Sequence, residues 1–407
     1  MVSHRLPAPI GCVIAPPVRT VRAYREAARR RRGVPAPARH RAFEVLCRLM
    51  RRIRAVLVVS VSVVALLLGL SQSSATPQGS QFVGTGWVRL GGPDRYDTAV
   101  AVSQATFPES SAYTSRVVVA TGEDFPDSLA ASALAAVEEA PLLLVRKNSV
   151  PATVANEIRR LRPDQILIVG GTGAVSSAVE TELRGLLVLT DQYHFVERLG
   201  GRDRYETAAA VAQSTYFLWS EGYPPGDVVI ANGDSYADAM VGAGMAALHE
   251  APIIFSTKDR LPRASEDFLR LPDVPWTSRH AYIIGGTGVV SDAVAATIRS
   301  LAPLRSDTRF TVLRYSGPDR YATAAAVASA LKPHWDGRTI MYATGENFPD
   351  GLTAGAASHS AIGVIPLLLT KQSCMPRITA QITQQFKPAL QVVVGQSDVA
   401  YAGGRVC

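Results

Sequence analysis

Three arginines and three aspartates recur at matched places and are the side chains best suited to chemistry. The tripeptide Asp-Arg-Tyr occurs three times, and each copy precedes a second motif that contains glycine, an aromatic residue and a final aspartate. The recurring members are Arg95, Arg204 and Arg320; Tyr96, Tyr205 and Tyr321; and Asp127, Asp238 and Asp350. Guanidinium groups bind phosphate or carboxylate through charge-assisted, often bidentate hydrogen bonds. Carboxylates can serve as general acids or bases, or as partners of arginine. The candidates are therefore an anion-binding site, a carboxylate active site and a set of structural ion pairs.

The arginine of Asp-Arg-Tyr opposes a local rule of helix formation. Gly92 suits a helix N-cap, Pro93 suits the first turn, and Asp94 is favourable near the positive end of the helix dipole. Arg95 places a cation in that same turn, and the other two copies repeat this arrangement. Because this unfavourable placement recurs three times, we expect another interaction to compensate for the charge of each arginine. We predict ion pairs within a repeat or between neighbours: Arg95–Asp127, Arg204–Asp238 and Arg320–Asp350.

Other catalytic and metal-binding patterns are weak. Ser235 sits where a degenerate nucleophile elbow would place it, but Asp124 and Asn347 occupy this position in the other copies. The carboxylate pair Asp124/Asp127 is also lost in the third copy. No histidine downstream of residue 190 forms a His-x-x-x-His pattern or clusters with cysteine. We expect no catalytic residue and no metal.

A third motif is a glycine-rich loop that follows a strand. It reads Gly170-Gly171-Thr172-Gly173 in the first copy and Gly285-Gly286-Thr287-Gly288 in the second. Such loops can cradle phosphate at a helix N-terminus, but neither dinucleotide nor Walker spacing is present. The third copy reads Gly395-Gln396-Ser397-Asp398 and places an acid where phosphate would lie. We therefore expect no cofactor.

The elements that position these motifs repeat with a period of about 110 residues, which is the size of a domain. In the first copy, apolar runs at 116–121, 141–144 and 165–169 alternate with helical segments. Continuous apolar runs indicate strands buried on both faces, and intervening helices indicate parallel βαβ units with right-handed crossovers. We predict three tandem doubly wound α/β domains, Rossmann- or flavodoxin-like, at 84–194, 195–309 and 310–407. Both charged motifs follow strands, so they should meet at the carboxyl edge where such sheets bind ligands.

The N-terminal region has a different composition. Residues 1–54 contain 14 Arg and only two acids, so the rest of the chain is mildly acidic despite a net charge of +8. A nucleic-acid-binding body is not indicated. The apolar run 55–70, with arginines before it and Ser73-Ser74-Ala75 after it, predicts a signal peptide at 50–75 that enters the membrane transiently. An uncleaved anchor is the alternative. Residues 1–49 are either a disordered tail or an upstream mis-start.

Two cysteines, Cys374 and Cys407, lie beyond the predicted signal peptide. In an oxidising exterior they would pair and fix the C-terminal tail, and two free thiols are the alternative.

The motifs together resemble the type 2 bacterial cell-wall-binding repeat. The resemblance rests on Arg-Leu-Gly-Gly-x-Asp-Arg-Tyr-x-Thr-Ala, Ala-Thr-Gly-Glu-x-Phe-Pro-Asp, Ala-Pro-Leu-Leu-Leu and Val-Gly-Gly-Thr-Gly, and it covers about residues 84–407. It implies three modules around a pseudo-threefold axis that anchor a protein non-covalently to anionic wall glycopolymers, with the arginines of the repeats at positions 95, 204 and 320. Departures include Arg202 for proline, Ser316 for glycine, and the altered third glycine loop.

Three functions remain open. The first is a secreted, non-catalytic wall-binding protein whose three weak sites gain by multivalency. The second is an enzyme that modifies wall sugars with Asp127, Asp238 or Asp350. The third is a scaffold in which the arginine–aspartate pairs only hold the repeats together.

Overall fold

The computed structural model describes residues 80–84, 86–108, 114–187, 194–218, 226–271, 279–301, 309–360, 363–396 and 405–407. The predicted tail (1–49) and signal peptide (50–75) lie outside these ranges. Within them, no helix is both long enough and apolar enough to cross a membrane. All described residues belong to one compact unit of the chain.

The first sheet consists of four parallel strands in the order β4-β3-β5-β6. Helices connect successive strands, as predicted from the alternation of apolar runs. Its elements are β3 (Arg116–Thr121), α4 (Pro126–Val137), β4 (Leu142–Val145), α5 (Ala152–Leu161), β5 (Gln165–Val169), α6 (Ser177–Leu186) and β6 (Phe195–Leu199). The strand order reverses between β3 and β5, so this is the switch point at which an open α/β sheet can bind a ligand.

The second sheet repeats this topology in the order β8-β7-β9-β10. Its elements are α7 (Arg204–Leu218), β7 (Val228–Asn232), α8 (Tyr236–His249), β8 (Ile253–Ser256), α9 (Arg263–Leu269), β9 (His280–Ile284), α10 (Asp292–Ser300) and β10 (Thr311–Tyr315). The interiors of β7, β8 and β9 are buried and mostly β-branched or aromatic, as expected of strands covered on both faces, whereas the edge strand β10 is partly exposed.

The third sheet has the order β14-β11-β15-β2, with β1 added antiparallel at the edge. Its elements are α11 (Arg320–Leu331), η2 (Lys332–His334), β11 (Thr339–Thr344), α12 (Pro349–Ala356), β12 (His359–Ser360), β13 (Gly363–Val364), β14 (Leu367–Thr370), α13 (Arg377–Phe386) and β15 (Leu390–Val394). The remaining elements come from the start of the first repeat: β1 (Ser80–Gly84), β2 (Trp87–Leu90) and α3 (Arg95–Thr106).

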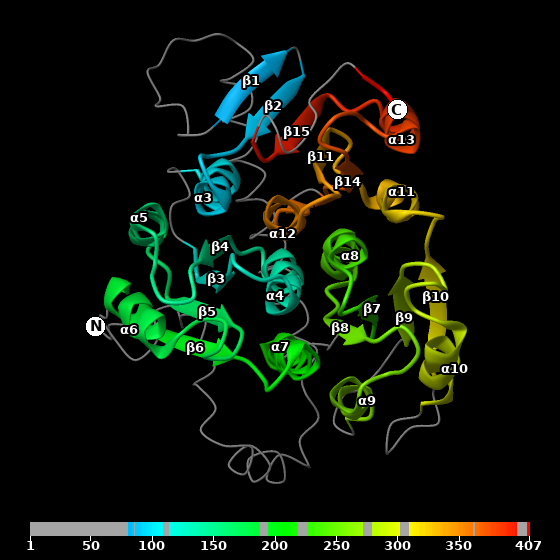
Figure 1. Ribbon diagram of the computed structural model, residues 1–407, viewed down its shortest axis with the longest axis horizontal. Coiled ribbons are helices and arrows are strands. Elements are labelled where there is room, and N and C mark those ends of the chain that lie inside the picture. Colours follow the sequence, from blue (N-terminus) through cyan, green and yellow to red (C-terminus); the bar gives the residue numbers. More distant parts are fainter. Residues whose placement is uncertain are drawn as a thin grey trace, which may run out of the picture. The chain divides into compact units, whose positions relative to one another are not determined.

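The first strand of each repeat completes the sheet of another repeat, which the repeat pattern alone did not show. β6 opens the second repeat but pairs with β5 of the first, and β10 opens the third but pairs with β9 of the second. β2 opens the first repeat and pairs with β15 of the third. The exchange therefore closes a ring of three, and every Asp-Arg-Tyr corner carries the chain from one sheet to the next (Figure 1).

The repeats pack through three central helices, α4, α8 and α12, which contact one another (Figure 1). These helices are rich in alanine, glycine and serine and are almost entirely buried. Small side chains allow close approach: Ser132 donates to the carbonyl of Leu352 at 2.8 Å, and a Cβ at Gly355 would lie 2.7 Å from the Ser132 hydroxyl oxygen. The predicted pseudo-threefold arrangement of doubly wound domains is confirmed.

A disulfide joins Cys374 to Cys407, with the two Cα atoms 5.8 Å apart. The backbone of Met375 exchanges hydrogen bonds with the last residues, accepting from the N–H of Cys407 and donating to the carbonyl of Arg405, both at 2.9 Å. The C-terminus is thereby held against the third repeat.

Candidate functional site: an arginine and aromatic ring

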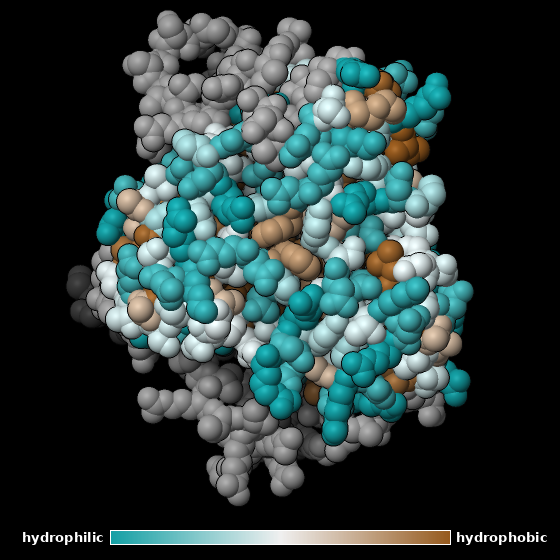
Figure 2. All heavy atoms as spheres, viewed as in Figure 1, coloured by the Kyte–Doolittle hydropathy of each residue, from teal (hydrophilic) through white to brown (hydrophobic). Residues whose placement is uncertain are grey.

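The aromatic residues of the second motif meet at the pseudo-threefold axis. Phe125 and Phe348 are the N-caps of α4 and α12, and Tyr236 is the first residue of α8. Their ring centroids are 5.7, 5.8 and 6.3 Å apart, in tilted or edge-to-face geometry. All three are half-buried, and Figure 2 shows a small hydrophobic spot surrounded by hydrophilic residues at the centre of this face. These aromatics are not among the site residues predicted from the sequence, although the shared aromatic position in each copy was the available signal.

Each arginine of Asp-Arg-Tyr lies over the aromatic ring of a different repeat. The guanidinium carbon of Arg95 lies 5.6 Å from the Phe348 ring centroid. The equivalent distances are 5.8 Å for Arg204 over Phe125 and 5.5 Å for Arg320 over Tyr236. These separations are within the range of cation–π attraction. The contacts form a cycle, so the three arginines and the three aromatic side chains make one composite site. We call this site the arginine and aromatic ring.

The same arginines are also tied to their own repeat. Each donates from Nη1 to the carbonyl of the glycine that follows the next strand of its own repeat: Arg95 to Gly122 after β3, Arg204 to Gly233 after β7 at 2.7 Å, and Arg320 to Gly345 after β11. This carbonyl and the aromatic face supply the compensation that a cation at a helix N-terminus requires.

The ring carries positive charge from two sources. Besides three guanidinium groups, the N-termini of α4, α8 and α12 contribute the positive ends of their helix dipoles. One arginine is partly neutralised, because Arg204 pairs with the exposed Asp234 at 2.9 Å. Arg320 is exposed and donates to the hydroxyl of Tyr236 at 3.1 Å. The arrangement can attract an anionic group and offer flat aromatic surface beside it.

The predicted partners of the aspartates need correction. Asp127 lies beside Arg204 and accepts from Thr207, both of which belong to the second repeat and not to its own. Asp238 likewise lies beside Arg320 and accepts from Thr323 of the third repeat. The pairs Arg95–Asp127 and Arg204–Asp238 are therefore wrong, because strand exchange brings the next Asp-Arg-Tyr corner to Asp127 and to Asp238.

Burial also changes the role of these aspartates. Asp238 and Asp350 are only 5% and 7% exposed, which leaves them little surface for a polymer. Desolvation raises the pKa of Asp127, and it raises that of Asp238 to about 6, although the neighbouring arginine and threonine oppose this. We assign Asp127 and Asp238 to the junctions between repeats.

The tyrosines of Asp-Arg-Tyr are also mainly structural. Tyr96 and Tyr321 are 4% and 8% exposed, and Tyr205 is half-buried. Each ring lies against the glycine of the second motif: a Cβ at Gly122 would lie 2.8 Å from the ring of Tyr96. Desolvation raises the pKa of all three tyrosines. Burial leaves Tyr96 and Tyr321 little exposed surface, although Tyr321 also lines a pocket together with Lys371.

A second set of arginines, not predicted from the sequence as site residues, holds the glycine loops. Arg89, Arg198 and Arg314, from the strand before Asp-Arg-Tyr, donate to the carbonyls of Gly395, Gly170 and Gly285 at 3.0, 2.8 and 2.8 Å. The recurrence of an arginine at the start of the Arg-Leu-Gly-Gly motif was the sequence signal for this second set.

Two histidines of the second repeat gather at the opposite edge of its sheet. His280 Nδ1 and His249 Nδ1 lie 3.0 and 3.3 Å from the carboxylate of Asp227, which also accepts from Tyr282 at 3.0 Å. Burial alone would raise the pKa of Asp227, but these hydrogen bonds together lower it far below its usual range. In the described part of the chain, no group of three or more His, Cys, Asp or Glu is arranged to hold a metal ion.

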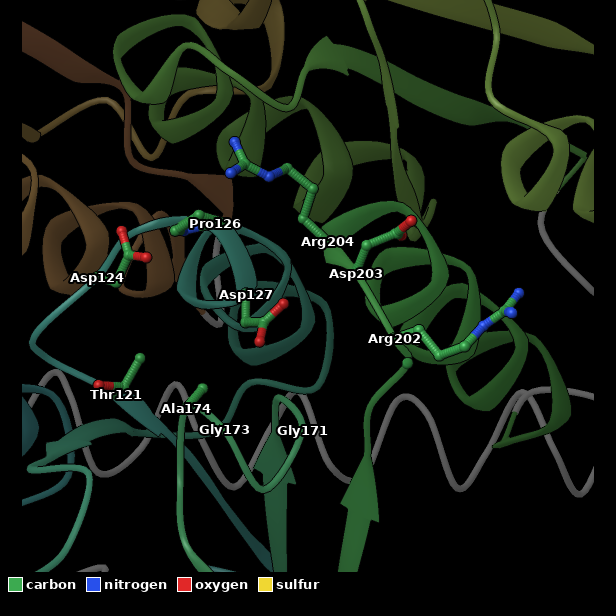
Figure 3. A pocket seen from close by; sticks show the side chains of 11 residues that line it. Thr121, Asp124, Pro126, Asp127, Gly171, Gly173, Ala174, Arg202, Asp203 and Arg204 are labelled. Carbon is green, nitrogen blue, oxygen red and sulfur yellow. The ribbon is translucent and has the colours of Figure 1, made fainter.

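A pocket of about 280 Å³ opens at the switch point of the first sheet (Figure 3). Thr121, Asp124 and Asp127 line it from the end of β3 and the start of α4. The glycine loop after β5 forms another wall, and the Asp-Arg-Tyr corner of the second repeat closes it.

Comparison with known proteins matches this architecture. The sequence profile of cell wall binding domain 2 (CWB2) matches residues 89–180, 198–295 and 314–402. The chain is similar to N-acetylmuramoyl-L-alanine amidase LytC of Bacillus subtilis (strain 168), at 30% identity over 66% of this chain and 47% of that protein. It is also similar to the amidase enhancer of the same organism, at 27% identity over 73% of this chain and 36% of that protein.

Two solved structures share the fold. Cwp6 from Clostridium difficile superimposes with a TM-score of 0.63 at 24% identity, over 81% of this chain and 48% of that one. Cwp8 from Clostridium difficile gives a TM-score of 0.63 at 25% identity, over 77% and 50%. The chain spans about half or less of the length of each of these relatives. Because the three matched segments follow the three repeats, the chain belongs to the cell wall binding domain 2 family.

Proposed function

We propose that this protein is secreted and attaches non-covalently to an anionic glycopolymer of the bacterial cell wall through the arginine and aromatic ring. Arg95, Arg204 and Arg320 would contact phosphate or carboxylate groups of the polymer. The half-buried aromatics would offer their faces to the sugar rings between those groups. The observation that carries this proposal is the convergence of three guanidinium groups, one from each repeat, around a single aromatic cluster.

The mechanism is electrostatic positioning. A guanidinium group already oriented by a glycine carbonyl loses little conformational freedom when an anion binds, so the cost of ordering is reduced. Three such groups on one rigid body would engage successive anionic groups of one polymer chain, and each further contact would be intramolecular. Family membership and the wall-related names of the two Bacillus subtilis relatives support this proposal.

Two observations disfavour the enzymatic alternative. The repeated carboxylates of Asp238 and Asp350 are buried, and those of Asp127 and Asp238 accept from threonines across the junctions. A general acid or base must reach the substrate within hydrogen-bond distance, which burial denies to Asp238 and Asp350, so the three copies cannot share a carboxylate mechanism. Non-catalytic attachment therefore fits the site better than sugar modification.

The test replaces all three ring arginines with alanine and measures retention on purified walls at increasing salt. We expect the variant to remain folded and to be released at lower salt than wild type, because it lacks three charge-assisted contacts. The matched control removes three exposed arginines outside the ring, Arg159, Arg184 and Arg263. Equal retention of the ring variant and wild type would remove these residues from the mechanism.

A further inference from the structure

The three junctions between repeats are equivalent in backbone but differ in what occupies them. Each is formed by a strand end, a glycine loop and the next Asp-Arg-Tyr corner. A Cβ at Gly170, Gly285 or Gly395 would lie 2.9, 2.9 or 2.6 Å from Oδ2 of the aspartate of its junction, so the three aspartates occupy matched places. Differences between the junctions therefore reflect the surrounding side chains.

Gln396 occupies the junction between the third and first repeats. It replaces the second glycine of the loop, and its side-chain amide donates to the carbonyls of Gly92, at 2.7 Å, and Pro93. Those two residues correspond to Gly201 and Arg202, which line the pocket in the first junction. The glutamine side chain thus spans the place where the pocket would be.

At the junction between the second and third repeats, Asn232 ties the end of its strand to the glycine loop of its own repeat. It stands at the end of β7, and its side-chain amide donates to the carbonyl of Val289 in the glycine loop at 2.6 Å. Val289 is also larger than its counterpart in the first repeat, which is Ala174.

The first junction has neither feature and is open. Thr121 replaces Asn232 and accepts locally from the N–H of Glu123 at 3.1 Å, so it does not reach the loop. Gly171 replaces Gln396 and carries no side chain. These replacements leave the pocket of about 280 Å³ (Figure 3).

The pocket presents hydrogen-bond acceptors. Asp124, Asp127 and Asp203 line it together with Thr121, and Oδ1 of Asp203 already accepts from the N–H groups of Tyr205 and Glu206 at the start of α7. Each lining arginine already pairs with a carboxylate outside the pocket, Arg202 with Glu206 and Arg204 with Asp234, although the charge of Arg204 still lowers the pKa of Asp127. Figure 3 shows both guanidinium groups pointing away from Asp127. An anionic ligand would be repelled here, whereas hydroxyl groups would donate charge-assisted hydrogen bonds.

We propose that this pocket binds a single uncharged sugar ring. Hydroxyl groups of the sugar would donate to the carboxylates of Asp124 and Asp127, and its C–H face would lie against Pro126 and Ala174. The volume of about 280 Å³ is just below the roughly 300–1,000 Å³ usual for small-molecule pockets, which suits one ring rather than an oligosaccharide. The site is separate from the arginine ring and does not depend on the proposed attachment to an anionic polymer.

The test uses the natural plug of the third junction. Gly171→Gln copies Gln396 into the open junction; Gly171 has no positive φ, and its Cβ would lie 3.3 Å from the carbonyl oxygen of Gly201. The matched control, Gly286→Gln, places the same side chain in the second junction. If Gly171→Gln fails to fold, Ala174→Val, which copies Val289, is a smaller obstruction.

Amide chemical shifts of the protein are followed during titration with glucose, N-acetylglucosamine and glucuronate. We expect at least one of the two uncharged sugars to cause saturable changes around Gly171, Gly173 and Asp124, and to bind better than glucuronate. We expect the changes to disappear in Gly171→Gln and to persist in Gly286→Gln. The proposal is overturned if neither uncharged sugar binds or if glucuronate binds equally well. It is also overturned if the chemical-shift changes persist in Gly171→Gln. Wall retention of the same variants, measured separately, reports on the arginine ring.

Discussion

Trp87 packs against Tyr342 with their ring centroids 5.3 Å apart, although one residue opens the first repeat and the other lies in the third. The contact follows from the pairing of β2 with β15, which closes the ring of repeats. Strand exchange of this kind makes each repeat dependent on another for a complete sheet.

Trp87→Ala should therefore weaken the third repeat and not the first, by about 2 kcal/mol for the loss of a partly buried aromatic. Native-state hydrogen exchange should show faster exchange in β11 and β15. Phe195 occupies the matching position in β6, so Phe195→Ala is the control and should loosen β5 instead. Faster exchange in β3 or β5 after the Trp87 change would contradict the ring closure.

The central helices should not tolerate added volume. In Gly355→Ala, the new methyl group would lie 2.7 Å from the Ser132 hydroxyl and 3.0 Å from the Met240 carbonyl oxygen. We expect a loss of about 1–3 kcal/mol in the free energy of unfolding, measured by denaturant titration.

Gly185→Ala supplies the contrast within the same protein. Gly185 lies in α6, and a Cβ there meets no atom within 4 Å. This change should stabilise the protein by up to about 1 kcal/mol through helix propensity. Equal effects of the two changes would show that the close helix approach is not required for stability.

Asp238 should make stability depend on pH between about 4 and 6. Desolvation raises its pKa in the folded protein to about 6, from 3.8 in the unfolded chain. The folded state then binds the proton more tightly, so the free energy of unfolding should fall as pH rises through this window. Ionisation of Asp238 should lower the free energy of unfolding by an amount on the order of 3 kcal/mol across this window.

Asp238→Asn removes the ionisation and keeps an acceptor for Thr323, so the melting temperature should vary less between pH 4 and pH 7. Asp267→Asn, which changes an exposed aspartate of the same repeat, is the control. An unchanged pH profile in the Asp238 variant would contradict its assignment to a desolvated junction.

The disulfide should stabilise mainly the end of the third repeat. Cys374 and Cys407 close a loop with a sequence separation of 33 residues, for which the chain-entropy estimate is about 3–4 kcal/mol. Replacing both cysteines with serine should lower the melting temperature and increase exchange at Met375 and Arg377. The sugar pocket is formed by the other repeats, and its ligand response should persist.

Much of the fold could be predicted from the sequence, because buried parallel strands and their helices leave continuous apolar runs separated by turn residues. Tripling of the motifs also identified Arg95 and its two counterparts. The partners of Asp127 could not be predicted, because motif order cannot show that β6 leaves its own repeat to complete the preceding sheet. Burial of Tyr96 was missed for a related reason: a tyrosine next to an arginine in a helix can point to either the core or the surface.

Attachment to an anionic wall polymer is the property on which the proposed function depends. The most direct measurement compares binding of residues 76–407 to purified walls before and after removal of their anionic polymers; this fragment omits the arginine-rich segment 1–54, which would itself bind polyanions. We predict salt-sensitive binding to intact walls, loss of that binding on stripped walls, and weak binding of the triple arginine variant to both. Undiminished binding of the wild-type fragment to stripped walls would contradict the account.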